Sequence, residues 1–395
     1  MNNQKAHWSL KPCLLAKHKA RPVFGAGRPE GSNAPGRNKQ LMKRYGNLYH
    51  KIYDMDNILK AHENARKGKK HYYEVCMVDA NPEKYFERIQ TMLKNKTFKN
   101  SLYKVFIKKG RKDRMIHKLP YFPDRIIHHC IVQVLEPIWV PWLIPDTLAC
   151  LKGRGIHKGV KCIKNALRTD PEGTRYCLKM DVKKFYPSLD HDILKRILAR
   201  KIKDPDVLWL LGRIIDSTDK GVPIGNYLSQ YFGNLYLTGL DHRIKEDLKC
   251  RHYIRYCDDM VILHADKSRL HEIRKEIEAH LIDRLNLTLK SDWQVFPVAV
   301  RGIDFIGYRF FPGYTLLRKS TALKFKRKMR AIRIGKYNEK YPISIASTIM
   351  SYYGWVKHAN CLNLWHRHVD ENIKEILVDV CKKGGFSNPL EKRFT

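Results

Sequence analysis

The sequence predicts an α+β fold in which an antiparallel sheet carries helices on one face. Two apolar runs flank the adjacent residues Asp258 and Asp259, which predicts a tight β-hairpin with both carboxylates at its tip. A short, mostly apolar stretch at Tyr176–Val182 predicts a buried strand with Asp181 at its exit. Helical periodicity fills the segments between, so the expected order is strand, helix, helix, hairpin, helix and strand pair.

Composition limits the class of protein. The chain has 395 residues and 43% hydrophobic content, enough for one large multi-part domain or two to three subdomains. Its formal net charge of +37 is spread along the chain among 11% aromatic residues, which favours a polyanionic partner, most simply nucleic acid. A ribosomal or chromatin-like packing protein would share this charge, but such proteins rarely carry a clustered acidic hairpin.

Cysteine usage and hydropathy indicate the compartment. The ten cysteines are scattered, with no C-x-x-C pair and no matching ladder of cysteine and histidine. This pattern argues against a disulfide framework and a structural zinc site, and it fits a reducing cytoplasm. No segment approaches 18 uninterrupted apolar residues, and the N-terminus shows no hydrophobic signal region. We expect a cytoplasmic protein with no membrane partner.

The chain divides into four regions by composition and periodicity. Residues 1–40 are basic and rich in glycine and proline, which predicts a flexible tail. Residues 41–170 combine helices with a basic hairpin, and residues 171–311 contain the predicted sheet. Residues 312–395 are basic and helical, with aromatic residues interleaved, a pattern that suits gripping a nucleic-acid duplex.

The basic hairpin is predicted from two alternating segments. Tyr103–Ile107 alternates as a strand does, a basic turn follows, and a return strand starts at Met115. Lys109, Lys112 and Arg114 would then project from a stiff support, which suits holding a triphosphate. Taken alone, the segment would be interpreted as an ordinary solvated basic turn.

Helix signals organise the rest of the chain. Asp190 and Asp192 stand where helix starts favour acids, so we assign them to capping and to the helix dipole and not to a metal. The remaining expected elements are a helix at 124–135 ended by Pro137, one helix from Tyr227 to about Lys249, a helix at 270–285, and a pair of strands at 292–300 and 303–311.

Asp181 differs from the capping acids because an unpaired carboxylate at the end of a buried strand is costly. If its strand pairs beside the hairpin, Asp181, Asp258 and Asp259 converge at one end of the sheet. Three carboxylates there suit two Mg²⁺ ions, with Mn²⁺ as a substitute. One ion would activate a primer 3′-hydroxyl and the other would bridge a triphosphate, which is the chemistry of nucleotidyl transfer. Two acids in a surface turn remain the alternative for the hairpin alone.

The order of these motifs resembles that of reverse transcriptases. Asp181-x-x-x-x-Tyr186 resembles motif A, residues 221–230 resemble motif B, Tyr256-Cys-Asp-Asp259 resembles motif C, and residues 302–308 resemble motif E. The resemblance implies a right-hand polymerase with fingers (41–170), palm (171–311) and a helical thumb (312–395). It also implies that Asp181, Asp258 and Asp259 are the catalytic metal ligands.

Further roles are implied by the same resemblance. Tyr186 would be the steric gate that excludes a ribose 2′-hydroxyl. The implied nucleotide-binding residues are Lys109, Lys112, Arg114, Tyr186, Ile224, Gly225 and Gln230. The implied primer-grip residues are Gly302, Phe305, Gly307 and Tyr308.

Motif B indicates a subgroup. Group II intron enzymes usually carry Gln-Gly-x-x-x-Ser-Pro, whereas this chain has Ile224 in place of the glutamine and Gln230 in place of the proline. These replacements are similar to the reverse transcriptases of diversity-generating retroelements. That resemblance implies copying of a template-repeat RNA, from a primer and with dNTPs, into adenine-mutagenised cDNA for mutagenic retrohoming. It also implies a basic accessory variability protein, usually a pentamer.

Two other interpretations stay open. The chain could be a defence-type or retron reverse transcriptase, or a catalytically idle, maturase-like RNA-binding protein. Fidelity offers a physical criterion, because a glutamine at position 224 could hydrogen-bond near the incoming sugar and Ile224 offers only apolar contact. Losing such a contact costs about 1–3 kcal/mol of discrimination. The basic tail is not an obvious feature of the family, and its role stays open.

Overall fold

The computed structural model describes residues 43–110, 113–335 and 342–383. The chain divides into two units, 1–41 and 42–395, and every described residue belongs to the second. The predicted tail at 1–40 and the predicted phosphate contact Lys112 therefore lie outside the described residues.

The first part of the described chain is helical, and α1 (Tyr49–Ile52) and α2 (Met55–Ala65) pack against α5 (Ile126–Trp139), which is apolar on most of its faces. The sequence predicted that this helix ends at Pro137. Helix α5 instead continues through the proline to Trp139. A proline in the last turn removes a single hydrogen bond, and the buried Trp139 keeps that turn packed. The other helices here are α3 (Tyr73–Ala80) and α4 (Pro82–Lys94).

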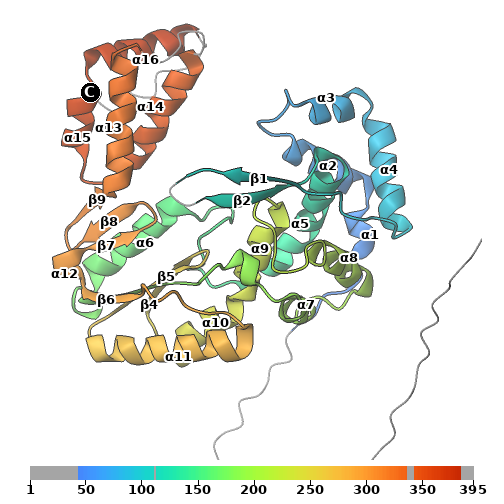
Figure 1. Cartoon of the computed structure of the whole chain (residues 1–395), viewed down its shortest axis with the longest axis horizontal. Coiled ribbons are helices and arrows are strands. Elements are labelled where there is room, and N and C mark those ends of the chain that lie inside the picture. The colour runs from blue at the N-terminus through green and yellow to red at the C-terminus, as the bar shows by residue number, and fades with distance from the viewer. Residues whose placement is uncertain (1–42, 111–112, 336–341, 384–395) are drawn as a thin grey trace, which may run out of the picture. The chain divides into compact units, whose positions relative to one another are not determined.

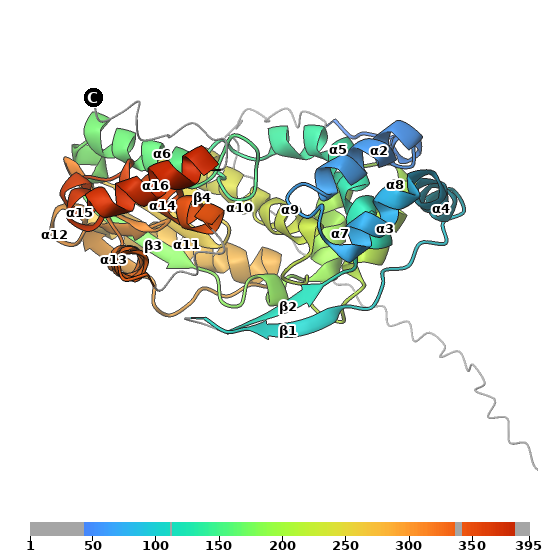
Figure 2. The same cartoon turned by 90° about the horizontal axis from the view of Figure 1, so that it is seen from above.

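The predicted basic hairpin is confirmed as β1 (Lys104–Lys108) and β2 (Arg114–Lys118), which pair antiparallel from Lys104 opposite Lys118 to Lys108 opposite Arg114. The two strands lie side by side in both views (Figure 1, Figure 2). No third strand joins them within the described residues. Apolar side chains on the hairpin, including Phe106 and Ile107, are exposed.

A four-stranded antiparallel sheet forms the centre of the fold and confirms the predicted α+β class. Its strand order is β4-β5-β3-β6, so β3, which comes first of these four strands in the sequence, lies inside the sheet. Helix α11 (Lys267–Leu285) packs across β3, β5 and β6 (Figure 1). The strands are β3 (Tyr176–Asp181), β4 (His252–Tyr256), β5 (Asp259–His264) and β6 (Gln294–Pro297).

Alternation along the strands gives the sheet two faces. Met180 and Met260 belong to the core that includes the buried residues of α11. Cys177 and Val261 belong to a second core with α6 (Ile156–Thr169) and a smaller sheet. Asp181 lies four residues after Cys177 and therefore shares the face of the second core.

Helices α7 (His191–Ala199) and α8 (Pro205–Ile215) follow β3, and each has an aspartate N-cap. Asp190 accepts hydrogen bonds from the backbone amides of Asp192 and Ile193, which confirms its predicted capping role.

The prediction of one continuous helix from Tyr227 to about Lys249 is wrong, because the segment forms several shorter helices. Helix α9 (Tyr227–Tyr236) ends at Leu237, α10 (Thr238–His242) follows, and a short helical turn completes the segment. Thr238 donates a hydrogen bond to the carbonyl of Trp142, and the poor helix former Gly239 follows it. The segment nevertheless buries one apolar face, which includes Leu228, Phe232, Leu235, Tyr236 and Leu240.

The predicted pairing of 292–300 with 303–311 is also wrong. Strand β6 joins the edge of the central sheet beside β3, whereas the later segment forms a separate three-stranded sheet. The one-turn helix α12 (Val298–Arg301) and Gly302, whose φ is +70°, turn the chain between them. The strands of the second sheet are β7 (Ile303–Phe305), β8 (Tyr308–Phe311) and β9 (Tyr314–Leu317).

The predicted C-terminal helices are present and pack around aromatic rings. Phe325 and Trp365 stack with ring centroids 5.9 Å apart and planes 8° from parallel. No helix among the described residues is both long and apolar enough to cross a membrane. The helices are α13 (Lys319–Arg333), α14 (Pro342–Val356), α15 (Leu362–His368) and α16 (Glu371–Lys383).

Candidate active site

Three carboxylates meet at one end of the central sheet, as the sequence predicted. Strand β3 ends at Asp181, which pairs directly with Asp259 at the start of β5. The turn between β4 and β5 is Cys257–Asp258, and Cys257 has a φ of +56°, typical of a tight hairpin turn. The prediction that both carboxylates lie at the tip is therefore correct for Asp258 and wrong for Asp259, which is the first residue of β5 and pairs with Tyr256.

Burial and neighbouring carboxylates raise the pKa values of Asp258 and Asp259. Burial, followed by the neighbouring Asp181 carboxylate, raises the pKa of Asp258 to about 6. Burial is also the largest cause for Asp259, whose pKa rises to about 7 although the ammonium of Lys179 opposes the shift. Keeping the three acids ionised together is therefore unfavourable without a cation between them.

Two lysines lie against the acids, and sequence reasoning missed both. Lys290 forms an ion pair with Asp181, and Lys179 lies with its Nζ 3.9 Å from Oδ2 of Asp259. Lys179 could have been found, because it is two residues before Asp181 and so shares its face. Lys290 arrives through the fold: its backbone amide donates to the carbonyl of Asp181 at 2.9 Å.

A buried ion pair supports the turn that carries Asp258. Arg255 and Asp241 are both fully buried, with Nη2 of the arginine 2.5 Å from Oδ2 of the aspartate. Nη1 of Arg255 also donates to the carbonyl of Cys257 at 2.8 Å. The hydroxyl of Tyr253 donates to the same aspartate at 2.7 Å. This network ties the hairpin turn to α10 and fixes where Asp258 lies.

The acids suit a hard divalent cation in their chemistry. Oδ1 of Asp259 is buried without a hydrogen-bond partner, and carboxylate oxygens are the ligands that Mg²⁺ prefers. Within the described residues, however, no three aspartate, glutamate, histidine or cysteine side chains are grouped closely enough to hold an ion as they stand. Lys290 occupies one side of Asp181. We therefore expect metal binding to displace Lys290 from that carboxylate.

The raised pKa values predict how stability depends on pH and Mg²⁺. An ordinary aspartate has a pKa of about 3.9, so the folded protein holds more protons than the unfolded chain between about pH 4 and pH 7. The contribution of Asp258 and Asp259 to stability is therefore present below pH 4 and lost as the pH rises through 6 to 7. We expect Mg²⁺ to raise the melting temperature at pH 7.5 and to have little effect at pH 4.5.

Thermal melting in EDTA and in Mg²⁺ across this pH range measures the effect, with Ca²⁺-free buffers throughout. An equal rise in melting temperature on adding Mg²⁺ at pH 4.5 and at pH 7.5 would contradict the prediction, because protonated carboxylates are poor ligands.

The motif B loop lies against the basic hairpin and the end of motif A. The amide of His117 in β2 donates to the carbonyl of Ile224 at 2.9 Å. Gly225 has a φ of +113°, and a Cβ at this position would lie 2.9 Å from the carbonyl oxygen of His117. The carbonyl of Tyr186 accepts from the amide of Val222 at 2.9 Å. The fold thus brings Tyr186, Ile224 and Gly225 together.

Tyr186 also reaches the acidic turn, with its hydroxyl 3.9 Å from Sγ of Cys257. Gln230, in α9, is exposed. Lys109 and Arg114 are exposed on the hairpin, and neither forms a hydrogen bond or ion pair through its side chain within the described ranges. Their contact with a triphosphate stays a prediction, as does the gating role of Tyr186.

The predicted primer-grip residues lie in the second sheet. Phe305 and Tyr308 are fully buried, and the hydroxyl of Tyr308 donates to the carbonyl of Trp355 in α14 at 3.0 Å. Gly307 lies under the same tryptophan, since a Cβ there would be 2.5 Å from its ring. Gly302 lies under the ring of Phe311. Buried residues can act on a primer only by positioning the strands around them, so the primer-grip role stays a prediction.

Comparison with known sequences agrees with the geometry. The family described as "Reverse transcriptase (RNA-dependent DNA polymerase)" matches residues 107–310, more than half of the chain. Protein YkfC of Escherichia coli (strain K12) is 24% identical over 235 residues, covering 48% of this chain and 61% of YkfC. Group II intron-encoded protein LtrA of Lactococcus lactis subsp. cremoris is 26% identical over 170 residues, covering 40% of this chain and 28% of LtrA. The chain thus spans less than two thirds of either relative.

Solved structures give a weaker likeness. Apo telomerase from Candida tropicalis has 12% sequence identity and a TM-score of 0.46, covering 73% of this chain and 59% of that chain. Telomerase from Candida albicans in complex with a telomeric RNA fragment has 12% identity and a TM-score of 0.43, covering 73% of this chain and 67% of that chain.

Proposed function

Because this chain belongs to the reverse transcriptase (RNA-dependent DNA polymerase) family, we propose that it copies RNA into DNA by nucleotidyl transfer. The observation that carries this proposal is the direct pairing of Asp181 with Asp259, beside Asp258 in the adjoining turn. These three residues are the proposed metal ligands. The four regions inferred from the sequence are proposed to serve as tail, fingers, palm and thumb.

In the proposed mechanism, bound Mg²⁺ ions would activate the primer 3′-hydroxyl and stabilise charge on the triphosphate. The chain's own residues hold the geometry. Arg255 fixes the turn that carries Asp258 through the carbonyl of Cys257. Lys109 and Arg114 are proposed to bind the triphosphate, and Tyr186 is proposed to exclude a ribose 2′-hydroxyl.

We further propose that the copying is error-prone and belongs to a diversity-generating retroelement. The substrates would be a template-repeat RNA, a primer and dNTPs, and a basic pentameric accessory protein would assist. Support comes from Ile224, whose backbone carbonyl is held by the amide of His117 and whose side chain cannot hydrogen-bond. An apolar contact there would leave the incoming nucleotide less tightly positioned.

The test is deep sequencing of cDNA made on a mixed-sequence RNA template by the wild type and by Ile224→Gln. We expect the glutamine variant to reduce errors opposite template adenine about tenfold, because a polar positioning contact contributes about 1–3 kcal/mol. Ile224→Val is the matched control, since it keeps an apolar β-branched side chain. An unchanged error spectrum in Ile224→Gln would remove motif B as the cause.

Intron-associated RNA binding is a second candidate function. Two relatives carry names of this kind, the group II intron-encoded protein LtrA and nuclear intron maturase 1 of Arabidopsis thaliana, which is 28% identical over 115 residues. A maturase-like protein would bind and help fold its RNA without needing the acids. Stimulation of RNA splicing that survives Asp258→Asn, with no cDNA from the wild type, would favour this candidate. Accurate cDNA would instead favour a retron or defence enzyme.

A further inference from the structure

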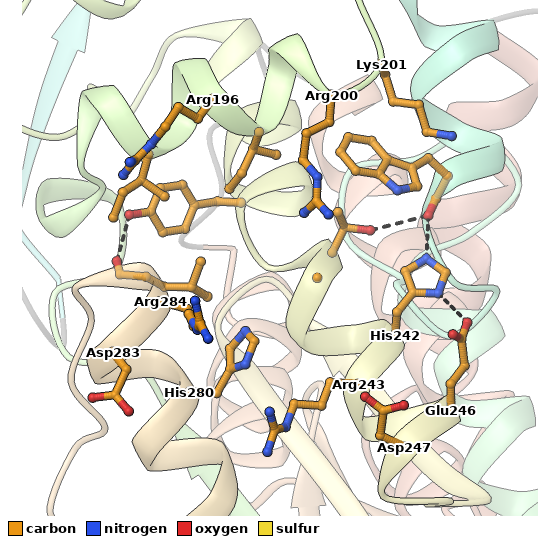
Figure 3. Close-up of a pocket in the computed structure, with 17 residues that line it drawn as sticks. Arg196, Arg200, Lys201, His242, Arg243, Glu246, Asp247, His280, Asp283 and Arg284 are labelled. Carbon is orange, nitrogen blue, oxygen red and sulfur yellow. Dashed lines mark hydrogen bonds and ion pairs between the residues drawn. The ribbon is translucent and has the colours of Figure 1, made fainter. Parts of the chain in front are cut away.

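A hollow of about 940 Å³ lies between α7, α10 and α11, and Figure 3 shows the side chains around it. It lies behind the central sheet, since α11 packs with Met180 and Met260 and the carboxylate of Asp181 belongs to the opposite face. The pocket is therefore separate from the candidate active site.

Three arginines line this pocket from two helices. Arg196 lies in α7, Arg200 directly follows that helix, and Arg284 lies in the last turn of α11 (Figure 3). None of the three forms a hydrogen bond or ion pair through its side chain with any residue that the structure describes. Their charges are therefore available to a ligand.

Helix geometry gathers positive charge around this pocket. Arg196 and Arg200 are exposed and four residues apart at the end of α7, a spacing at which like charges repel. A helix C-terminus stabilises a nearby cation, which accounts for Arg196 and Arg284 individually. A bound anion would interact favourably with all three guanidinium groups at once.

The pocket wall has two more incompletely satisfied polar groups. Nε of Arg243 and Nδ1 of His280 are buried and have no hydrogen-bond partner. Burial, followed by the charges of Arg243 and Arg284, lowers the pKa of His280, although the carboxylate of Asp283 opposes the shift. The same wall carries three acids, Glu246, Asp247 and Asp283, against five lysine and arginine side chains. Glu246 is engaged by His242, whose Nδ1 lies 2.6 Å from its carboxylate.

We propose that this pocket binds phosphate groups of the template RNA outside the segment being copied. The proposal rests on the proposed function, which supplies an RNA partner. Guanidinium groups bind phosphate in a bidentate manner, and arginines spread over two helices suit successive phosphates of a backbone more than one small anion. The pocket would hold a folded part of the RNA on the rear of the sheet while the copied strand moves through the active site.

The test uses the full chain with Arg200→Glu/Arg284→Glu, and Lys267→Glu/Lys275→Glu as the control. The control residues are exposed on α11, lie outside the pocket and change the net charge equally. Fluorescence anisotropy measures binding of a folded, labelled RNA over a KCl series. We expect the pocket variant to bind the RNA at least about tenfold more weakly than the control does. The slope of log affinity against log KCl concentration should also fall by the amount expected for the loss of about two phosphate contacts.

Primer extension on a short RNA template with a DNA primer is measured in parallel and is expected to match the control. If the wild type does not extend the primer, the proposed function is contradicted. The RNA-binding comparison between the pocket variant and the control would still test the pocket. Equal RNA affinity and equal salt slope in the two variants would overturn the inference. If only inorganic pyrophosphate or dNTP binding were weakened, the ligand would be a free phosphate and the RNA assignment would be overturned.

Folding is controlled by comparing melting temperatures. If the glutamate substitutions lower the melting temperature, Arg200→Gln/Arg284→Gln removes the charges without introducing acids. Arg200→Lys/Arg284→Lys keeps the charges and is expected to retain most of the salt slope, a rescue that a purely structural role would not produce.

Discussion

Replacing Asp258 with asparagine is expected to abolish primer extension while making the metal-free fold more stable. Asparagine keeps the size of the side chain but removes a charged ligand, and the loss of a metal contact costs several kcal/mol of transition-state stabilisation, or about 10³-fold in rate. The same change removes an ionised group at pH 7 that is disfavoured by burial and, after that, by the carboxylate of Asp181, the two causes that raise the pKa of Asp258 to about 6.

Single-nucleotide extension rates in Mg²⁺ and melting temperatures in EDTA measure the two effects on one preparation. Asp192→Asn is the matched control, because Asp192 is an exposed acid in the first turn of α7. The control should retain extension. Mg²⁺-dependent extension by Asp258→Asn at a rate near the wild type would mean that the catalytic site lies elsewhere.

Replacing Asp241 with alanine is expected to reduce the free energy of unfolding by about 3–5 kcal/mol. The reason is that Arg255 would remain fully buried without its counter-ion, and a buried unpaired charge is among the costliest defects in a protein. Tyr253 would lose the acceptor of its hydroxyl at the same time.

Urea unfolding measures this effect, with Asp216→Ala as the control. Asp216 is exposed and pairs with Lys195, so its loss should change stability by less than about 1 kcal/mol. The double variant Asp241→Leu/Arg255→Met should recover stability, because it removes both buried charges. It should still extend primers more slowly, since nothing then holds the carbonyl of Cys257. Equal stability of Asp241→Ala and the wild type would contradict this account.

The sequence predicted those features that depend on neighbouring residues. The strand ending at Asp181, the β4–β5 hairpin and the cap at Asp190 each arise from a local pattern, and the structure has all three. The sequence did not predict that the strand of Asp181 pairs with the hairpin. It predicted only that the three acids would converge if the strands paired in this way, because strand order is set by the whole fold.

Features made by distant residues were not predictable from local patterns. The ion pair between Arg255 and Asp241 forms between two elements, and no local pattern specifies either residue as the partner of the other. Lys290 reaches Asp181 because the chain after α11 runs beside the end of β3. The break at Leu237 likewise depends on a carbonyl of Trp142 supplied by another segment.

The order of the central sheet has a consequence for folding kinetics. Strand β3 lies between β5 and β6, both of which come much later in the chain, whereas β4 and β5 form a local hairpin. Loop-closure entropy delays contacts between distant segments, so β3 should join the sheet after the hairpin has formed. The repulsion between Asp181 and Asp259 opposes that same step. The three acids therefore come together only when the sheet is complete, and a partly folded chain has no assembled active site.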